Sequence, residues 1–159
     1  MATSGKNLST YTNKGLPDIS KKKFGMVVAE WNSEITEALY AAAYETLVKN
    51  GAAKDNIIRM NVPGSYELSF GAQVAAQKSD IDAVICLGCV IQGETRHFEF
   101  ICQSVTQGIK DVSLKYNKPV IFGVLTTDNK KQALDRAGGK HGNKGDEAAI
   151  TAVKLLGIM

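Results

Sequence analysis

Short apolar runs alternate along the chain with longer stretches of helical periodicity, four times in succession. The runs are rich in valine and other aliphatic residues, as in strands that are buried on both faces. The predicted strands are Phe24 to Glu30, Ile57 to Val62, Asp82 to Val90 and Pro119 to Thr126. Each interval has room for a crossover helix, which requires parallel strands with right-handed connections. The pattern therefore predicts an α/β fold, a three-layer αβα sandwich with a four-stranded parallel sheet.

Helical faces fall between and after these strands. The first helix has Ser33 as its predicted N-cap and Gly51 as its C-terminal stop. A longer helix, over about residues 97–116, follows the third strand. Two helical pieces, about 130–137 and 145–157, end the chain, and a glycine-rich basic stretch separates them.

The length of 159 residues suits one domain, which we place at residues 24–159, after a flexible basic N-terminal tail at residues 1–23. The net charge is +3, but residues 1–24 alone contain five lysines and one aspartate. The other 135 residues carry 14 basic and 15 acidic side chains. A nucleic-acid-binding protein spreads its basic residues over a folded face. The distribution therefore argues against nucleic acid as a partner.

The apolar pattern indicates where the protein is located, and the cysteines indicate the redox state of its surroundings. No run approaches the roughly 20 apolar residues of a bilayer helix, and no N-terminal stretch resembles a secretory signal. An odd number of cysteines, Cys86, Cys89 and Cys102, favours reduced thiols in the cytoplasm. Cys86 and Cys89 have C-x-x-C spacing, but on a strand they point to opposite faces, about 10 Å apart. We expect no metal site there, because two histidines are too few to complete a ligand set.

Ligands of open parallel sheets bind outside the carboxyl ends of the strands. The segments there are Glu30 to Asn32, Pro63 to Glu67, Val90 to His97 and Thr126 to Asp128. The G-x-G-x-x-G fingerprint is absent after the first strand, and Gly139-Lys140 is followed by histidine where a P-loop has Ser or Thr. Residues 31–33 match poorly the Ser/Thr/Gly loop of a flavodoxin-type electron carrier, which stays a weak alternative.

Three side chains at this edge suit chemistry on a small ligand. His97 begins a helix whose free N–H groups can hold an anion, and an imidazole there can transfer protons near pH 7. A lone histidine at a helix start is also a common surface feature. Trp31, the only tryptophan, can stack on a flat heterocycle or pack. Glu67 can accept hydrogen bonds from ligand hydroxyls or complement its helix dipole.

Arg136, Lys140 and Lys144 lie among glycines, so that backbone and cations can close on a phosphate. The same composition is typical of a solvated helix end, and the spacing leaves both interpretations open. Together, these features suit a planar polar substrate that is joined to a phosphorylated one.

Three motifs carry a resemblance over about residues 24–157: Val62 to Glu67, Gly88 to Glu99, and Gln132 to Gly138 followed by Gly142 to Gly145. At these residues the chain resembles the 6,7-dimethyl-8-ribityllumazine synthase family. The resemblance implies a flavodoxin-like topology and a transferase of riboflavin biosynthesis. The implied reaction condenses 5-amino-6-(D-ribitylamino)uracil with 3,4-dihydroxy-2-butanone 4-phosphate, releases phosphate and water, and uses no metal or redox cofactor.

The resemblance also implies a role for each matching residue. His97 matches the proton-transfer histidine, and Trp31 falls where an aromatic ring stacks on the pyrimidine. The pyrimidine and ribityl site is implied to comprise Ser65, Tyr66 and Glu67, with mainly backbone contacts from Cys89, Val90 and Ile91. Phosphate binding is implied for Glu94, Thr95 and Arg136, with Lys140 and Lys144 as additional candidates. Phe122 matches a ring-lining phenylalanine that, like Arg136, comes from the neighbouring subunit.

Members of this family are pentamers or hollow shells of twelve pentamers. The short loop from Gly138 to Gly145 favours the 60-subunit shell, and the basic tail is then assigned to assembly or to the shell surface. Riboflavin synthase is implied as a further partner, and riboflavin or FMN as a ligand. The main alternative is a flavin-binding or container protein of the same fold without turnover.

The chain departs from the commonest family pattern at three positions. Gln92 stands where a basic residue is frequent, and Glu94 where a small one is. A carboxylate opposes phosphate binding unless it points away and only the backbone N–H engages the anion. Trp31 replaces the more usual phenylalanine and widens the stacking platform, from which we expect measurable binding of riboflavin itself.

Overall fold

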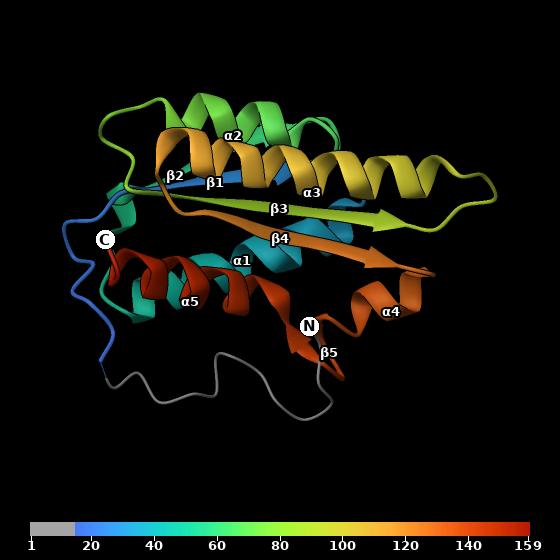
Figure 1. Ribbon diagram of the computed structural model, residues 1–159. Coiled ribbons are helices and arrows are strands. Elements are labelled where there is room, and N and C mark those ends of the chain that lie inside the picture. The colour runs from blue at the N-terminus through green and yellow to red at the C-terminus, as the bar shows by residue number, and fades with distance from the viewer. Residues whose placement is uncertain (1–14) are drawn as a thin grey trace.

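A computed structural model, which describes residues 15–159, places one four-stranded parallel sheet between two layers of helices (Figure 1). The strands are β1 (Phe24–Ala29), β2 (Ile57–Val62), β3 (Ala83–Ile91) and β4 (Val120–Thr127). The helices are α1 (Ser33–Lys49), α2 (Leu68–Ala76), α3 (His97–Tyr116), α4 (Lys130–Leu134) and α5 (Lys144–Leu156), with a short 3-10 helix at Lys54–Asn56. The predicted fold class is confirmed.

Each face of the sheet has its own hydrophobic core. Helices α1 and α5 cover one face, and α2 and α3 cover the other (Figure 1). All six residues of β1 are buried, because successive side chains of the strand enter opposite cores. Met26 packs on the α1/α5 side and Val27 on the α2/α3 side. Cys89 and Cys86 divide in the same way, which confirms that the C-x-x-C pair points to opposite faces.

The strand order is β2-β1-β3-β4, so the direction of winding reverses between β1 and β3. The pairing of β1 with β3 ends at Val28 opposite Leu87. By contrast, β3 pairs with β4 as far as Ile91 opposite Thr127. The end of β3 therefore extends beyond β1 at the point of reversal, which is where open α/β sheets bind ligands.

The structure corrects the expected elements in two places. The N-cap of α1 is Asn32, in the left-handed conformation with φ 61°, and not Ser33. The glycine-rich stretch forms an antiparallel hairpin, β5 (Ala137–Gly139) and β6 (Gly142–Asn143), so α4 ends earlier than predicted. Gly138 and Gly142 both have positive φ, which a glycine adopts without strain. Asn143 fixes the hairpin to α1 through an Nδ2 hydrogen bond to the carbonyl of Ala38 (3.1 Å).

Part of the expected flexible tail packs on the domain. Ile19 is fully buried and belongs to the core under α1 and α5. Lys22 pairs with Asp82 (3.0 Å), and Lys23 pairs with Asp80 (2.7 Å). Packing on the domain therefore already includes Ile19, before the first strand begins. Residues 1–14 lie outside the described residues.

We predict that Ile19→Ala lowers the free energy of unfolding by about 2–5 kcal/mol, the usual effect of truncating a buried aliphatic side chain. Urea denaturation of the full chain measures this difference. The exposed Lys21 supplies the control, since Lys21→Ala should change stability by less than about 0.5 kcal/mol. Equal stability of the two variants would show that Ile19 is not part of the core.

Candidate active site

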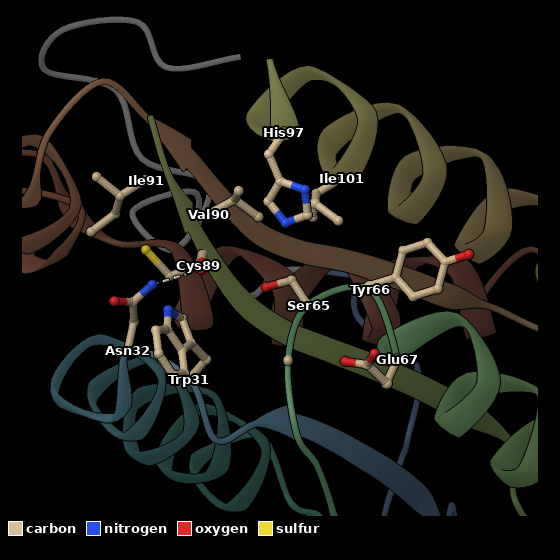
Figure 2. Close-up of a pocket in the computed structure, with 11 residues that line it drawn as sticks. Trp31, Asn32, Ser65, Tyr66, Glu67, Cys89, Val90, Ile91, His97 and Ile101 are labelled. Carbon is tan, nitrogen blue, oxygen red and sulfur yellow. Dashed lines mark hydrogen bonds between the residues drawn. The ribbon is translucent and has the colours of Figure 1, made fainter. Parts of the chain in front are cut away.

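A cavity of about 620 Å³ opens at the carboxyl ends of β1 and β3 (Figure 2). Its walls come from the turns after β1 and β2, the end of β3 and the first turns of α3. The lining residues are Trp31, Asn32, Gly64, Ser65, Tyr66, Glu67, Cys89, Val90, Ile91, His97 and Ile101. The structure thus brings eight of the predicted site residues together from separate parts of the chain.

Trp31 lies in the turn between β1 and α1, which comprises residues 30–32. The residue is 74% exposed and lines the cavity, so its side chain is not packed in the core. The turn is held by its backbone: Glu30 N–H donates to the carbonyl of Val62 (2.8 Å), and Trp31 N–H donates to that of Pro63 (3.0 Å). These bonds fasten the turn to the end of β2 and present the ring to the cavity.

The turn between β2 and α2 supplies the polar wall. The Ser65 hydroxyl is buried and has no hydrogen-bond partner within residues 15–159. A Cβ at Gly88 would lie 2.7 Å from this hydroxyl, so glycine at this position lets the turn rest on β3. Tyr66 is more than half exposed, and Glu67 stands directly before α2. This wall offers a hydroxyl, a phenol and a carboxylate to a ligand.

The end of β3 contributes Cys89, Val90 and Ile91. Burial raises the pKa of the Cys89 thiol to about 11, so the thiol stays neutral near pH 7 and is a poor nucleophile. Burial also raises the pKa of Cys86, which lies on the opposite face of the sheet. The chemistry available at this strand end is therefore that of its backbone.

His97 is the first residue of α3, and Figure 2 shows its ring over the cavity. Glu94 and Thr95 lie in the exposed loop just before it and are not among the lining residues. The Thr95 hydroxyl accepts a long hydrogen bond from His97 N–H (3.4 Å). The loop thus places an imidazole and the positive N-terminal end of α3 at one edge of the cavity.

Phe122 and Arg136 lie elsewhere. Both line a second cavity, of about 670 Å³, along β4 and α5, which shares no lining residue with the first. Phe122 is 39% exposed on β4, an edge strand, and Arg136 donates to the carbonyl of Gln132 (3.0 Å). Lys144 lines the same cavity and pairs with Glu147. Lys140 is exposed in the turn of the β5–β6 hairpin and lines neither cavity.

Sequence reasoning assigned no role to three lining residues, Asn32, Gly64 and Ile101. Ile101 follows His97 by four residues, the spacing that puts two side chains on one helix face. That spacing could have identified Ile101 from the sequence as a residue on the same helix face as His97. Gly64 and Asn32 stand in turns after strands, where the ligand edge was expected.

The charge around the first cavity is sparse. Among residues 15–159, Glu67 is the only Asp, Glu, Lys or Arg that lines it. Between residues 15 and 159, no three His, Cys, Asp or Glu side chains gather as metal ligands. Within the same range, no helix combines the length and the apolar character needed to cross a bilayer.

Comparison with known proteins gives a consistent match. The family model described as 6,7-dimethyl-8-ribityllumazine synthase matches residues 21–159. A 6,7-dimethyl-8-ribityllumazine synthase of Cytophaga hutchinsonii is 68% identical over 98% of this chain and 98% of its own. Synthases of Parabacteroides distasonis and Flavobacterium johnsoniae are 53% and 54% identical, over 98% and 99% of this chain and 98% and 83% of their own. With this breadth of match, the chain belongs to the 6,7-dimethyl-8-ribityllumazine synthase family.

Proposed function

We propose that the chain condenses 5-amino-6-(D-ribitylamino)uracil with 3,4-dihydroxy-2-butanone 4-phosphate to give 6,7-dimethyl-8-ribityllumazine, phosphate and water. One observation carries the proposal. In a chain of this family, an aromatic ring, a carboxylate and an imidazole from three separate segments meet around one cavity of about 620 Å³. The cavity has a size typical of small-molecule sites, which range over roughly 300–1,000 Å³.

The pyrimidine binds between Trp31 and the end of β3. The exposed indole stacks on the flat ring, and the unpaired backbone of β3 offers N–H and C=O groups to the ring's own donors and acceptors. Glu67 accepts hydrogen bonds from the ribityl hydroxyls, and Ser65 and Tyr66 add donors nearby. The buried Ser65 hydroxyl gains a partner when the ligand binds, which offsets the cost of its isolation.

His97 moves protons as the bond-forming steps proceed. The amine of the pyrimidine attacks the ketone and forms an imine with loss of one water. Phosphate then leaves, and the resulting enol becomes a carbonyl. The ribityl-bearing nitrogen attacks this carbonyl, and the ring closes with loss of a second water. Each step needs a proton moved at a nitrogen or an oxygen, and an imidazole over the cavity does this near neutral pH. The phosphate lies at Glu94 and Thr95, next to the positive N-terminal end of α3.

A second copy of the chain completes the site. Among residues 15–159, no lysine or arginine lines the first cavity, whereas Phe122 on the edge strand β4 and Arg136 both line the second cavity. We infer that a neighbouring subunit supplies both residues, and that the chain assembles as pentamers or as a 60-subunit shell. Lys144, beside Arg136, lies near the same phosphate. The wide ring of Trp31 also suits riboflavin or FMN as a bound ligand.

A single assay tests the activity. The pure full-length protein is mixed with both substrates, and the lumazine is followed by its absorbance and fluorescence. We expect a rate well above the spontaneous condensation. A rate equal to that background would defeat the proposal and favour a flavin-binding or container protein of the same fold.

The shared site predicts different effects for His97 and Arg136. His97→Ala should lower kcat about a hundredfold and leave some turnover, because orientation of two substrates supplies much of the acceleration. Arg136→Ala should raise the KM of the phosphorylated substrate about tenfold or more, through loss of a charge-assisted hydrogen bond. An unchanged KM would exclude Arg136 from phosphate binding.

Mixing two impaired variants, with the phosphorylated substrate well below its KM, then tests whether the site spans two chains. A Trp31→Ala/His97→Ala variant and an Arg136→Ala variant are unfolded together and reassembled, and each is also reassembled alone. Random mixing of copies restores about a quarter of the sites if residues come from neighbouring subunits. Activity equal to the mean of the separate variants would place the complete site in one chain.

Glu94 should weaken binding of the phosphorylated substrate. The carboxylate is exposed and has no ion-pair partner within residues 15–159, so its charge acts on the anion without compensation. We expect Glu94→Gln to lower the KM of that substrate a few-fold at low salt, and less at 0.5 M salt. Asp111→Asn, which removes an exposed charge farther along α3, is the control. An unchanged KM in Glu94→Gln would mean that the carboxylate points away from the phosphate.

A further inference from the structure

The end of β3 is open on the side that faces β1. Pairing with β1 stops at Leu87, although β3 continues to Ile91. Gln92 N–H donates to the carbonyl of Thr127 on the β4 side (2.8 Å). Because neighbouring residues of a strand direct their backbone groups to opposite sides, Cys89 and Ile91 turn theirs to the open side. Those groups need partners other than a strand.

Asn32 supplies one of these partners. Its Nδ2 donates to the carbonyl of Cys89 (3.0 Å), which is the dashed line in Figure 2. The side chain makes no capping bond to α1; the backbone carbonyl of Asn32 serves the helix instead, accepting from Ile35 N–H (2.8 Å) and Thr36 N–H (3.1 Å). The amide is therefore committed to β3, across a separation of 57 residues.

The backbone of Asn32 sets the direction of Trp31. Its φ of 61° and ψ of 44° lie in the left-handed region, which turns the chain sharply between β1 and α1. Asparagine is among the few non-glycine residues that adopt this region at small cost. The neighbouring Trp31 is 74% exposed as a residue, so little packing holds its side chain in place. Its orientation depends on the turn and on what fastens the turn.

We propose that Asn32 is a positioning residue, which locks the turn bearing Trp31 to the open end of β3. The lock fixes the spacing between the stacking ring and the strand edge that would contact the pyrimidine. It leaves the backbone groups of Ile91 free for the ligand, because the amide takes the carbonyl of Cys89. The identity of the ligand rests on the proposed function, whereas the lock is a property of the free protein.

Two substitutions separate the roles of the side chain and the backbone. Asn32→Gly and Asn32→Asp both accept the left-handed conformation, and neither can donate a hydrogen bond to the carbonyl of Cys89. Asn50→Asp is the matched control. Asn50 makes the same kind of bond, from Nδ2 to the carbonyl of Thr46 (2.7 Å), at the other end of α1.

The readouts are the mobility of Trp31 and the kinetic constants. Trp31 is the only tryptophan, so time-resolved fluorescence anisotropy of the ligand-free protein reports on this side chain alone. In both Asn32 variants we expect the amplitude of its fast local motion to rise about twofold. The KM of the pyrimidine should rise about fivefold, while kcat and the KM of the phosphorylated substrate change less than about twofold. Asn50→Asp should change none of these quantities.

Two results would overturn the proposed role of Asn32. Unchanged anisotropy in folded Asn32→Gly, with folding checked by thermal unfolding, would overturn the lock. A fall in kcat with both KM values unchanged would also overturn it, since Asn32 would then act on the reacting atoms. If the wild-type protein shows no turnover, the proposed function fails, and the anisotropy measurement alone decides the role of Asn32.

Discussion

The candidate site depends on one constraint: β1 stops pairing with β3 before β3 ends. The backbone N–H of Glu30, the residue after β1, turns to the carbonyl of Val62 and so leans toward β2. A gap then opens between that turn and the end of β3, at the reversal of strand order. The position of the cavity follows from backbone pairing, and the side chains determine only what the cavity can bind.

The edge strand β4 carries exposed side chains that a second copy of the chain could cover. Two of its eight residues, Phe122 and Thr126, are exposed, and they are four positions apart on one face. An aromatic ring left open on an edge strand favours association, because edges and apolar surface both attract partners. A second copy that covers β4 would remove that exposure and would bring Phe122 to a place where it can contact a substrate. The same contact then serves both stability and the proposed chemistry.

The sequence was most informative where one local pattern decides the structure. Continuous apolar runs predicted all four strands and their parallel arrangement, because crossover lengths leave no other connection. Ile19 was missed because a single apolar residue among polar ones has no periodicity. The β5–β6 hairpin is attached to α1 by the bond from Asn143 to Ala38, and the role of Asn32 depends on Cys89. No local pattern contains contacts over 105 and 57 residues.

The electrostatics of the first cavity explain why one chain would hold only half of a site. In the described part of the chain, Glu67 is the only Asp, Glu, Lys or Arg that lines this cavity, whereas a phosphate monoester carries nearly two negative charges at pH 7. The positive end of α3 contributes about half an elementary charge, which cannot balance that ester. The pyrimidine, by contrast, is neutral and needs only a flat ring and a strand edge, both of which this chain provides. In the proposed assembly, a neighbour's Arg136, which lines the second cavity, would supply the positive charge that the described part of the first cavity lacks.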